Sequence, residues 1–213
     1  TTTVANTNFI ITLETIFLAL FGYFFLKEKI NLITLISIIL GISGVLIILG
    51  SSLTIQTKEE FIGNIVALIM PISFAILVVI IRKYPNVDMV PSQFTAGIAA
   101  ALIGFFIADQ LTMSFKDIIL ASLAGIFQIG FGFILITVGS RTTPAAVVGV
   151  LMLTESVFGP LWAWLFINEI PPLTVLIGGA VIISAILFQS LFQGVLSNER
   201  QLAIFSVDQT IDP

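Results

Sequence analysis

Residues 13–28 read LETIFLALFGYFFLKE, and residues 154–169 read TESVFGPLWAWLFINE. In both stretches one glutamate lies inside an apolar run of helix length, and a second glutamate ends the run beside a polar loop. Glu14 and Glu155 are 141 positions apart (155 − 14), and Glu28 and Glu169 repeat that spacing (169 − 28). A carboxylate at mid-membrane depth costs roughly 2.5 to 3.5 kcal/mol on insertion scales, so it is by default a functional-site hypothesis. The occurrence of this pattern twice predicts a duplicated membrane fold that contains a binding site.

The composition excludes several classes of protein. Of the 213 residues, 58% are hydrophobic and only 9% are charged, with a mean hydropathy of +1.17, which is too little polar surface to coat a soluble globule. The chain contains no Cys and no His, which removes disulfides, thiol chemistry and histidine metal sites. We therefore expect no metal, no cofactor and no enzymatic activity. Loops this short and this sparsely charged also predict no nucleic-acid partner.

Seven apolar runs are long enough to cross a bilayer, which takes about 20 helical residues for a hydrocarbon core of roughly 30 Å. We predict helices at residues 5–26, 32–50, 61–81, 90–108, 118–139, 145–167 and 172–193. Short polar loops separate them, and residues 194–213 form a polar tail. The predicted fold class is all-α integral membrane protein.

The Lys and Arg residues of the short loops predict the orientation, because they favour the cytoplasmic side. One side collects six of them and the other side two: Lys27, Lys29, Arg82, Lys83, Arg141 and Arg200 against Lys58 and Lys116. We therefore expect a multi-pass protein of the cytoplasmic (inner) cell membrane with a cytoplasmic C-terminus. The other end, Thr1, then lies outside, so we expect an odd number of further helices upstream.

An internal repeat is the strongest signal in the sequence. A shift of 141 positions aligns residues 1–46 with residues 142–187 without a gap, and Leu or Ile matches are common in so apolar a chain, but matched Glu, Thr, Ser and Phe residues are not. The matches are Thr1–Thr142, Thr2–Thr143, Ala5–Ala146, Glu14–Glu155, Phe17–Phe158, Leu20–Leu161, Phe25–Phe166, Glu28–Glu169, Leu32–Leu173, Leu35–Leu176, Ile36–Ile177, Ile42–Ile183, Ser43–Ser184 and Leu46–Leu187.

The number of crossings between the two copies predicts their relative direction. Five crossings separate the first predicted helix from its copy, and because five is odd the copies point in opposite directions, as in the inverted repeats of secondary transporters. We expect residues 1–50 to be the last two helices of a first repeat and residues 61–193 to be a complete second repeat of five helices. On this prediction the chain is the C-terminal part of a ten-helix bundle and lacks three upstream helices.

The stretches at 13–28 and 154–169, together with residues 63–82, resemble the ten-helix EamA-type permeases of the drug/metabolite transporter (DMT) superfamily. Thr15 and Ser156 stand where proline often follows the glutamate of the family pattern, and Lys27 and Asn168 replace its usual glycine. The resemblance implies transport of a small organic metabolite, such as an amino acid or a related compound, by alternating access, with export favoured over import. Proton coupling and a homodimer are further candidate properties of such a permease.

Glu14 and Glu155 are the candidate residues for binding substrate or a proton, since removal from water disfavours the charged form of a carboxyl group. The alternative is a structural role as neutral hydrogen-bonding groups between helices. Four aromatic residues lie three and seven positions after these glutamates, on the same helix faces, and are candidates for lining a cavity or for ordinary packing: Phe17, Phe21, Phe158 and Trp162.

Three further polar residues have weaker assignments. Gln128, deep in an apolar span, could bind substrate or a neighbouring helix. Glu28 and Glu169 each lie just before a helix, and we predict structural roles for them at helix ends, where a carboxylate can accept from free backbone N–H groups.

A non-transporting or channel-like scaffold protein is the alternative to a permease.

Overall fold

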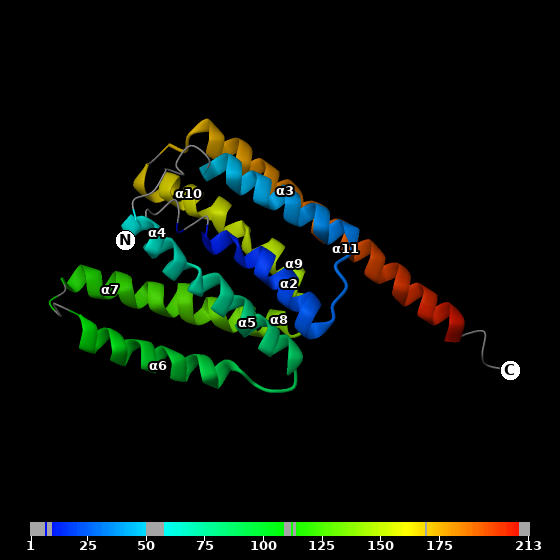
Figure 1. The fold of residues 1–213 in the computed structure, drawn as a ribbon, viewed down its shortest axis with the longest axis horizontal. Coiled ribbons are helices and arrows are strands. Elements are labelled where there is room, and N and C mark those ends of the chain that lie inside the picture. Colours follow the sequence, from blue (N-terminus) through cyan, green and yellow to red (C-terminus); the bar gives the residue numbers. More distant parts are fainter. Residues whose placement is uncertain are drawn as a thin grey trace. The chain divides into compact units, whose positions relative to one another are not determined.

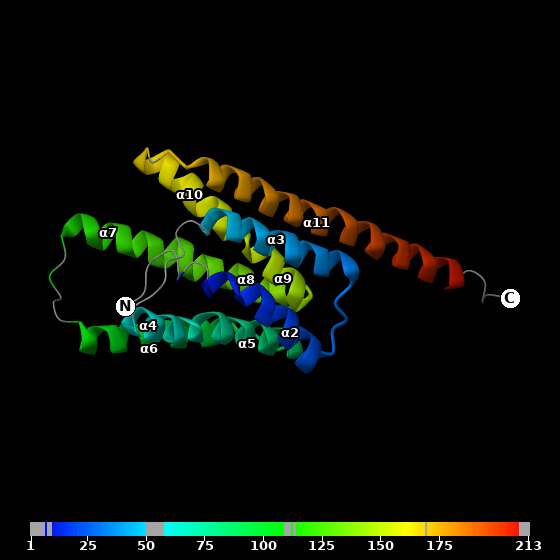
Figure 2. The same ribbon diagram turned by 45° about the horizontal axis from the view of Figure 1, so that its top comes forward.

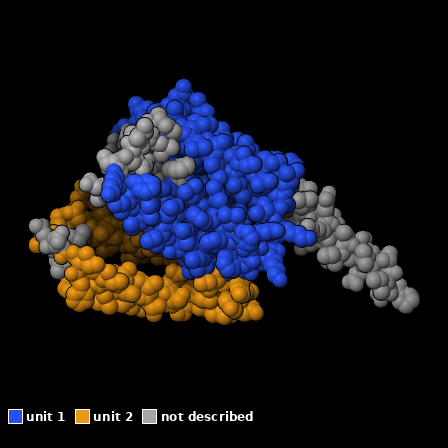
Figure 3. All heavy atoms as spheres, in the orientation of Figure 1, with its two compact units in different colours: residues 1–79, 144–213 blue, residues 80–143 orange. Residues whose placement is uncertain are grey.

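The computed structural model describes residues 7, 10–49, 58–108, 112, 114–168 and 170–208, and within these ranges the chain is helical almost throughout, with no strand (Figure 1). Helices suit a chain in a bilayer because they satisfy every backbone hydrogen bond within one segment. The chain divides into two compact units, residues 1–79 with 144–213 and residues 80–143 (Figure 3).

The described helices confirm the predicted fold class of an all-α membrane protein. Six of them are long and apolar enough to cross a bilayer, and the apolar helix Ile10–Leu26 is shorter within the described residues. The six are Leu32–Leu49, Phe61–Lys83, Val90–Ile107, Phe115–Ser140, Ala145–Phe166 and Leu173–Phe192.

The first unit contains the two helix pairs that the repeat relates. Helix α2 (Glu14–Leu26) ends 141 positions before α10 (Thr154–Ile167) ends, and α3 (Leu32–Leu49) begins 141 positions before α11 (Leu173–Asp208) begins. The unit also holds α4 (Lys58–Ala67), α9 (Ala145–Met152) and the larger part of α5 (Ile69–Lys83). The helix boundaries thus reproduce the spacing of the sequence repeat.

Helices α3 and α11 pack side by side and run in opposite directions (Figures 1 and 2). Their backbones touch at two glycines, since a Cβ atom added to Gly178 would lie 2.5 Å from the carbonyl oxygen of Gly44. The repeat equivalents of these glycines, Ala185 and Ser37, are fully buried as well. Small residues at helix contacts are the usual means of close approach in membranes, and here they occur at repeat-related positions.

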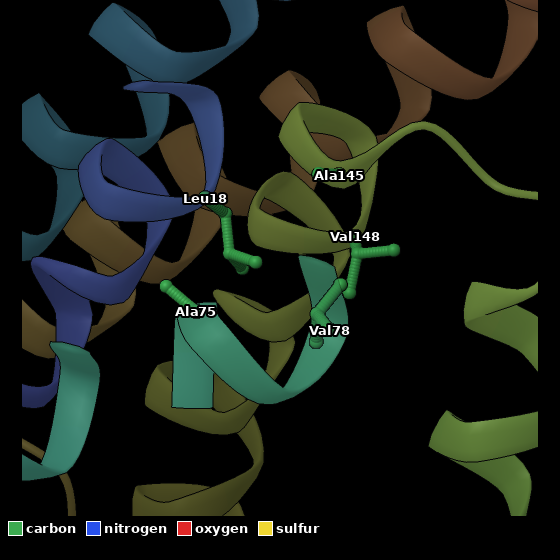
Figure 4. Close-up of a cluster of buried hydrophobic side chains, with 5 residues drawn as sticks. All are labelled: Leu18, Ala75, Val78, Ala145 and Val148. Atoms are coloured by element: carbon green, nitrogen blue, oxygen red, sulfur yellow. The ribbon is translucent and has the colours of Figure 1, made fainter. Parts of the chain in front are cut away.

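A buried apolar cluster joins three segments of the first unit (Figure 4). Leu18 of α2 lies among residues of α5 and α9, and none of the five is more than 7% exposed: Leu18, Ala75, Val78, Ala145 and Val148. This cluster fixes the inner face of α2 against α9.

Three helices of the first unit are interrupted. At Leu68, between α4 and α5, the interruption follows from Pro71, which lacks an N–H for the carbonyl of Ala67 and clashes with it. The interruptions at Leu13 and Leu153 have no proline or glycine of their own. The interruption at Leu13 precedes Glu14 by one residue, and the interruption at Leu153 precedes Glu155 by two. The two interruptions are therefore 140 positions apart (153 − 13), one fewer than the repeat spacing.

The second unit comprises the end of α5, α6 (Val90–Ile107), α7 (Phe115–Leu123), the π-helical segment η1 (Ala124–Phe131) and α8 (Gly132–Ser140). The Arg82 guanidinium donates to the carbonyl of Arg141 at 2.8 Å, and Arg141 forms an ion pair with Asp88 at 2.9 Å. These contacts tie the ends of α5 and α8 together.

The C-terminal helix is longer than the sequence predicts. Helix α11 continues to Asp208, beyond the predicted end of the span at residue 193. The assignment of residues 194–213 to a cytoplasmic tail stays a prediction.

Candidate functional site

The two inner carboxylates, Glu14 and Glu155, each begin a helix of the first unit. Glu14 lies in the first turn of α2 and is 6% exposed, whereas Glu155 lies in the first turn of α10 and is exposed. The two carboxyl groups are close enough to interact electrostatically. Residues 141 positions apart in sequence therefore lie within range of an electrostatic interaction, in a chain with 9% charged residues.

The helix interruptions give each carboxylate a similar backbone setting. Before Glu14, the N–H of Leu13 bonds to the carbonyl of Ile10 at 3.1 Å, and the N–H of Ile16 bonds to that of Leu13 at 3.0 Å. Before Glu155, the N–H of Ser156 bonds to the carbonyl of Leu153 at 3.1 Å. These three-residue spacings are tight turns rather than regular α-helix, so each glutamate stands at the start of a new helical segment.

A hydrogen bond between helices lies directly beside the pair. The Thr15 hydroxyl, fully buried, donates to the carbonyl oxygen of Gly149 at 3.0 Å. The bond joins α2, which carries Glu14, to the α9–α10 helix, which carries Glu155. In the sequence Thr15 is marked only by its departure from proline, because no short-range signal connects residues 134 positions apart.

The four candidate aromatic residues form two separate groups. Phe17 and Phe21, with ring centroids 6.0 Å apart, are partly buried and pack against the apolar cluster around Leu18. Phe158 and Trp162 are exposed and stack on each other with centroids 6.1 Å apart. The two groups follow the repeat in sequence but differ in their surroundings.

Gln128 lies in η1 of the second unit and is exposed. The carboxylate pair belongs to the first unit, so Gln128 is not among the residues that the first unit brings together. The π-helical segment around it is unexpected, and such segments often occur at functional sites. A role for Gln128 in binding stays a prediction.

Glu28 sits at a helix N-terminus, although not that of the helix that follows it. Its carboxylate accepts from the backbone N–H of Ala145, the first residue of α9, at 2.8 Å. The next helix, α3, is instead capped by Asn31, whose Oδ1 accepts from the N–H of Thr34 at 2.7 Å. Its repeat equivalent Glu169 lies outside the described residues.

A small hollow with polar and apolar walls lies beside Glu28. It opens where the end of α2 meets the starts of α3 and α9. Its polar wall residues are Tyr23, Glu28, Lys29, Asn31 and Thr34, and its other wall residues are Ala19, Gly22, Ile30, Pro144, Ala146 and Val147. All of these residues belong to the first unit. Such a hollow could not be read from the sequence, because it depends on how the two helix starts converge.

The described residues contain no group of three or more Asp, Glu, His or Cys side chains that could hold a metal ion. The polar groups of the site are the Glu14 and Glu155 carboxyl groups and, beside Glu14, the buried Thr15 hydroxyl. Such a set can bind cationic or polar groups and exchange protons.

Comparison with known proteins identifies the family. Residues 1–50 and 61–191 match the EamA-like transporter family. The chain belongs to this family. The EamA membership confirms the resemblance to drug/metabolite transporters and, together with the apolar helices, establishes a multi-pass membrane protein of a transporter family.

Individual relatives agree with this assignment. An uncharacterized transporter of Methanothermobacter thermautotrophicus is 26% identical over 180 residues, which cover 79% of this chain and 51% of the relative. An uncharacterized transporter of Clostridium kluyveri is 28% identical over 173 residues, covering 76% of this chain and 56% of the relative. The EamA chain thus spans about half the length of these relatives.

The fold also has a counterpart among solved structures. A protein crystal structure matches with a TM-score of 0.78 at 19% sequence identity, covering 89% of this chain and 69% of that chain. At this level of identity the similarity concerns the fold alone.

Proposed function

We propose that this chain is part of a permease that moves a small organic metabolite, such as an amino acid or a related compound, across the cytoplasmic membrane by alternating access. The observation that carries the proposal is that Glu14 and Glu155, which the sequence repeat relates, follow helix interruptions on two helices joined by the Thr15–Gly149 hydrogen bond and lie within electrostatic range of each other. Carboxylates within membrane-spanning helices are rarely kept without a ligand, a proton or a partner.

The architecture around the pair supports alternating access. Broken helices at the interface of two repeats commonly form transport sites, because their free ends offer polar groups inside the membrane. The antiparallel packing of α3 and α11 is what inverted repeats require. We further propose a cytoplasmic C-terminus, export as the direction of transport and a proton as the coupling ion, with a homodimer as the candidate assembly.

The test begins with the substrate. Metabolite profiling of cells with and without the intact gene would name the compounds that accumulate, and purified full-length protein in vesicles would then be assayed for their flux. The proposal expects saturable flux that is stimulated by the same compound on the opposite side. Absence of saturable flux for every accumulating compound would instead support the non-transporting scaffold, and flux that grows linearly with concentration would support a channel.

A further inference from the structure

Thr15 connects the two helices that carry the carboxylates. It follows Glu14 directly in α2, it is fully buried, and its hydroxyl donates to the carbonyl of Gly149 in α9 at 3.0 Å. Glu155 lies six residues beyond Gly149, just after the interruption at Leu153. The hydrogen bond therefore joins directly the backbone segments that hold the two glutamates.

The interruption explains why the Gly149 carbonyl is available. In a continuous α-helix it would accept from the N–H of Leu153, four residues later. Helix α9 ends at Met152, however, and the N–H of Leu153 is directed to the carbonyl of Leu151. A carbonyl without a donor is costly inside a bilayer, where no water replaces the lost bond. The Thr15 hydroxyl supplies the donor that the broken helix withholds.

Steric contact reinforces the hydrogen bond. A Cβ atom added to Gly149 would lie 2.9 Å from the Cα of Thr15 and 3.2 Å from its carbonyl oxygen. The two backbones are thus in direct contact, and there is no room for a side chain at position 149. One residue of α2 is held both by a directed bond and by close packing.

We propose that Thr15 is a positioning residue for the Glu14–Glu155 pair. Its hydroxyl donates to the Gly149 carbonyl, which the interruption at Leu153 leaves without its usual helical donor. This hydrogen bond fixes the distance between the Glu14 and Glu155 carboxylates. The importance of this spacing rests on the proposed transport function, but the spacing itself is a property of the fold and can be measured without transport.

The experiment measures the spacing directly. The 213 residues contain no Cys, so Glu14→Cys and Glu155→Cys introduce the only two thiols of this part of the chain. In membranes holding the full-length protein, with any upstream cysteine replaced, the thiols are bridged by bis-methanethiosulfonate reagents of increasing length. The cross-linking yield at each reagent length is compared among three proteins: the one that retains Thr15, the Thr15→Val variant, which loses the hydroxyl, and the Thr15→Ser variant, which keeps it.

We expect Thr15→Val to lower the cross-linking yield with the shortest effective reagent by about threefold to twentyfold. This is the change in an equilibrium constant that the loss of one hydrogen bond between membrane helices produces. Thr15→Ser should restore the yield to within about twofold. Ser43→Ala is the matched control, because that hydroxyl bonds only to Leu40 of its own helix. An unchanged length profile in Thr15→Val overturns the proposal, and so does an equal fall in the Ser43→Ala control.

A second variant keeps the test decisive if Thr15→Val does not reach the membrane. Gly149→Ala forces the two backbones apart, so the proposal predicts that bridging then requires a longer reagent. The same length as in the parent would overturn the proposal. Because bridging needs no flux, a Thr15-dependent yield in a protein without transport would refute the proposed function and leave the positioning role intact.

Discussion

Lys27 and Asn168 adopt the same left-handed backbone conformation, with φ angles of 57° and 58°, at positions 141 residues apart. Lys27 ends α2 and Asn168 follows α10, so the two repeat-related helices terminate in the same way. The N–H groups of Lys27 and Glu28 both reach the carbonyl of Gly22, which closes the helix end. Left-handed residues at helix ends favour glycine and then asparagine, which accounts for the glycine of the family pattern at these two positions.

The left-handed conformation predicts the effect of substitutions at Lys27. A residue other than glycine loses roughly 1–2 kcal/mol in this conformation, while glycine loses chain entropy of about half that amount. We expect Lys27→Gly to stabilise the folded protein by about 0.5–1 kcal/mol and Lys27→Val, which is β-branched, to destabilise it. Thermal unfolding in detergent measures both. The reverse order of the two variants would contradict the left-handed assignment.

The contact between α3 and α11 predicts that Gly178 cannot be enlarged. An added Cβ would lie 2.5 Å from both the Gly44 carbonyl oxygen and the Ile48 Cγ1, so Gly178→Ala should destabilise the protein by about 1–3 kcal/mol. Gly97→Ala is the matched control, since nothing lies within 4 Å of a Cβ at that position of α6, and alanine should gain up to about 1 kcal/mol there. Equal unfolding temperatures for the two variants would show that α3 and α11 do not touch at Gly178.

Glu28 should act on α9 and not on α3. Removing its carboxylate in Glu28→Ala leaves the Ala145 N–H without its acceptor, at a cost of about 0.5–2 kcal/mol. Glu28→Gln keeps an oxygen acceptor and loses only the charge at the helix N-terminus, about 0.3–1 kcal/mol. Hydrogen exchange at the Ala145 amide should therefore speed up most in Glu28→Ala and less in Glu28→Gln. Exchange at Ala145 that is the same in all three proteins would place the cap elsewhere.

The inverted repeat predicts which side of the membrane each loop faces. Cysteines introduced as Lys29→Cys and Ile170→Cys, at the starts of the regions that lead into α3 and α11, should react with an impermeant thiol reagent from opposite sides in the full-length protein. Lys83→Cys serves as the control and should react from the same side as Lys29→Cys. Labelling of Lys29→Cys and Ile170→Cys from the same side would contradict the opposite orientation of the two repeats.

The helices and their order could be predicted from the sequence because each span is a long apolar run between polar loops. The interruption at Leu68 is also accessible, since Pro71 cannot bond to Ala67. The interruptions at Leu13 and Leu153 could not be found in this way. Neither carries a proline or a glycine, so no local signal in the sequence marks them.

The candidate site was predictable in part for the same reason. The shared spacing of Glu14 and Glu155 identified them as equivalent residues, and the fold places them within electrostatic range. Equal spacing could not reveal that Phe17 and Phe21 pack into a core while Phe158 and Trp162 are exposed. Packing depends on neighbours from other helices, and a repeat in one stretch carries no information about them.

The most direct test of the account is the flux of the identified substrate through full-length protein carrying Glu14→Gln or Glu155→Gln, reconstituted in vesicles at matched protein levels. If the two carboxylates form the transport site, each substitution should reduce saturable flux by at least about tenfold while expression and unfolding temperature stay close to those of the parent. Asp117→Asn, an exposed carboxylate bonded to Ser114 at the start of α7, should leave flux unchanged. Undiminished flux in both Glu14→Gln and Glu155→Gln would contradict the account.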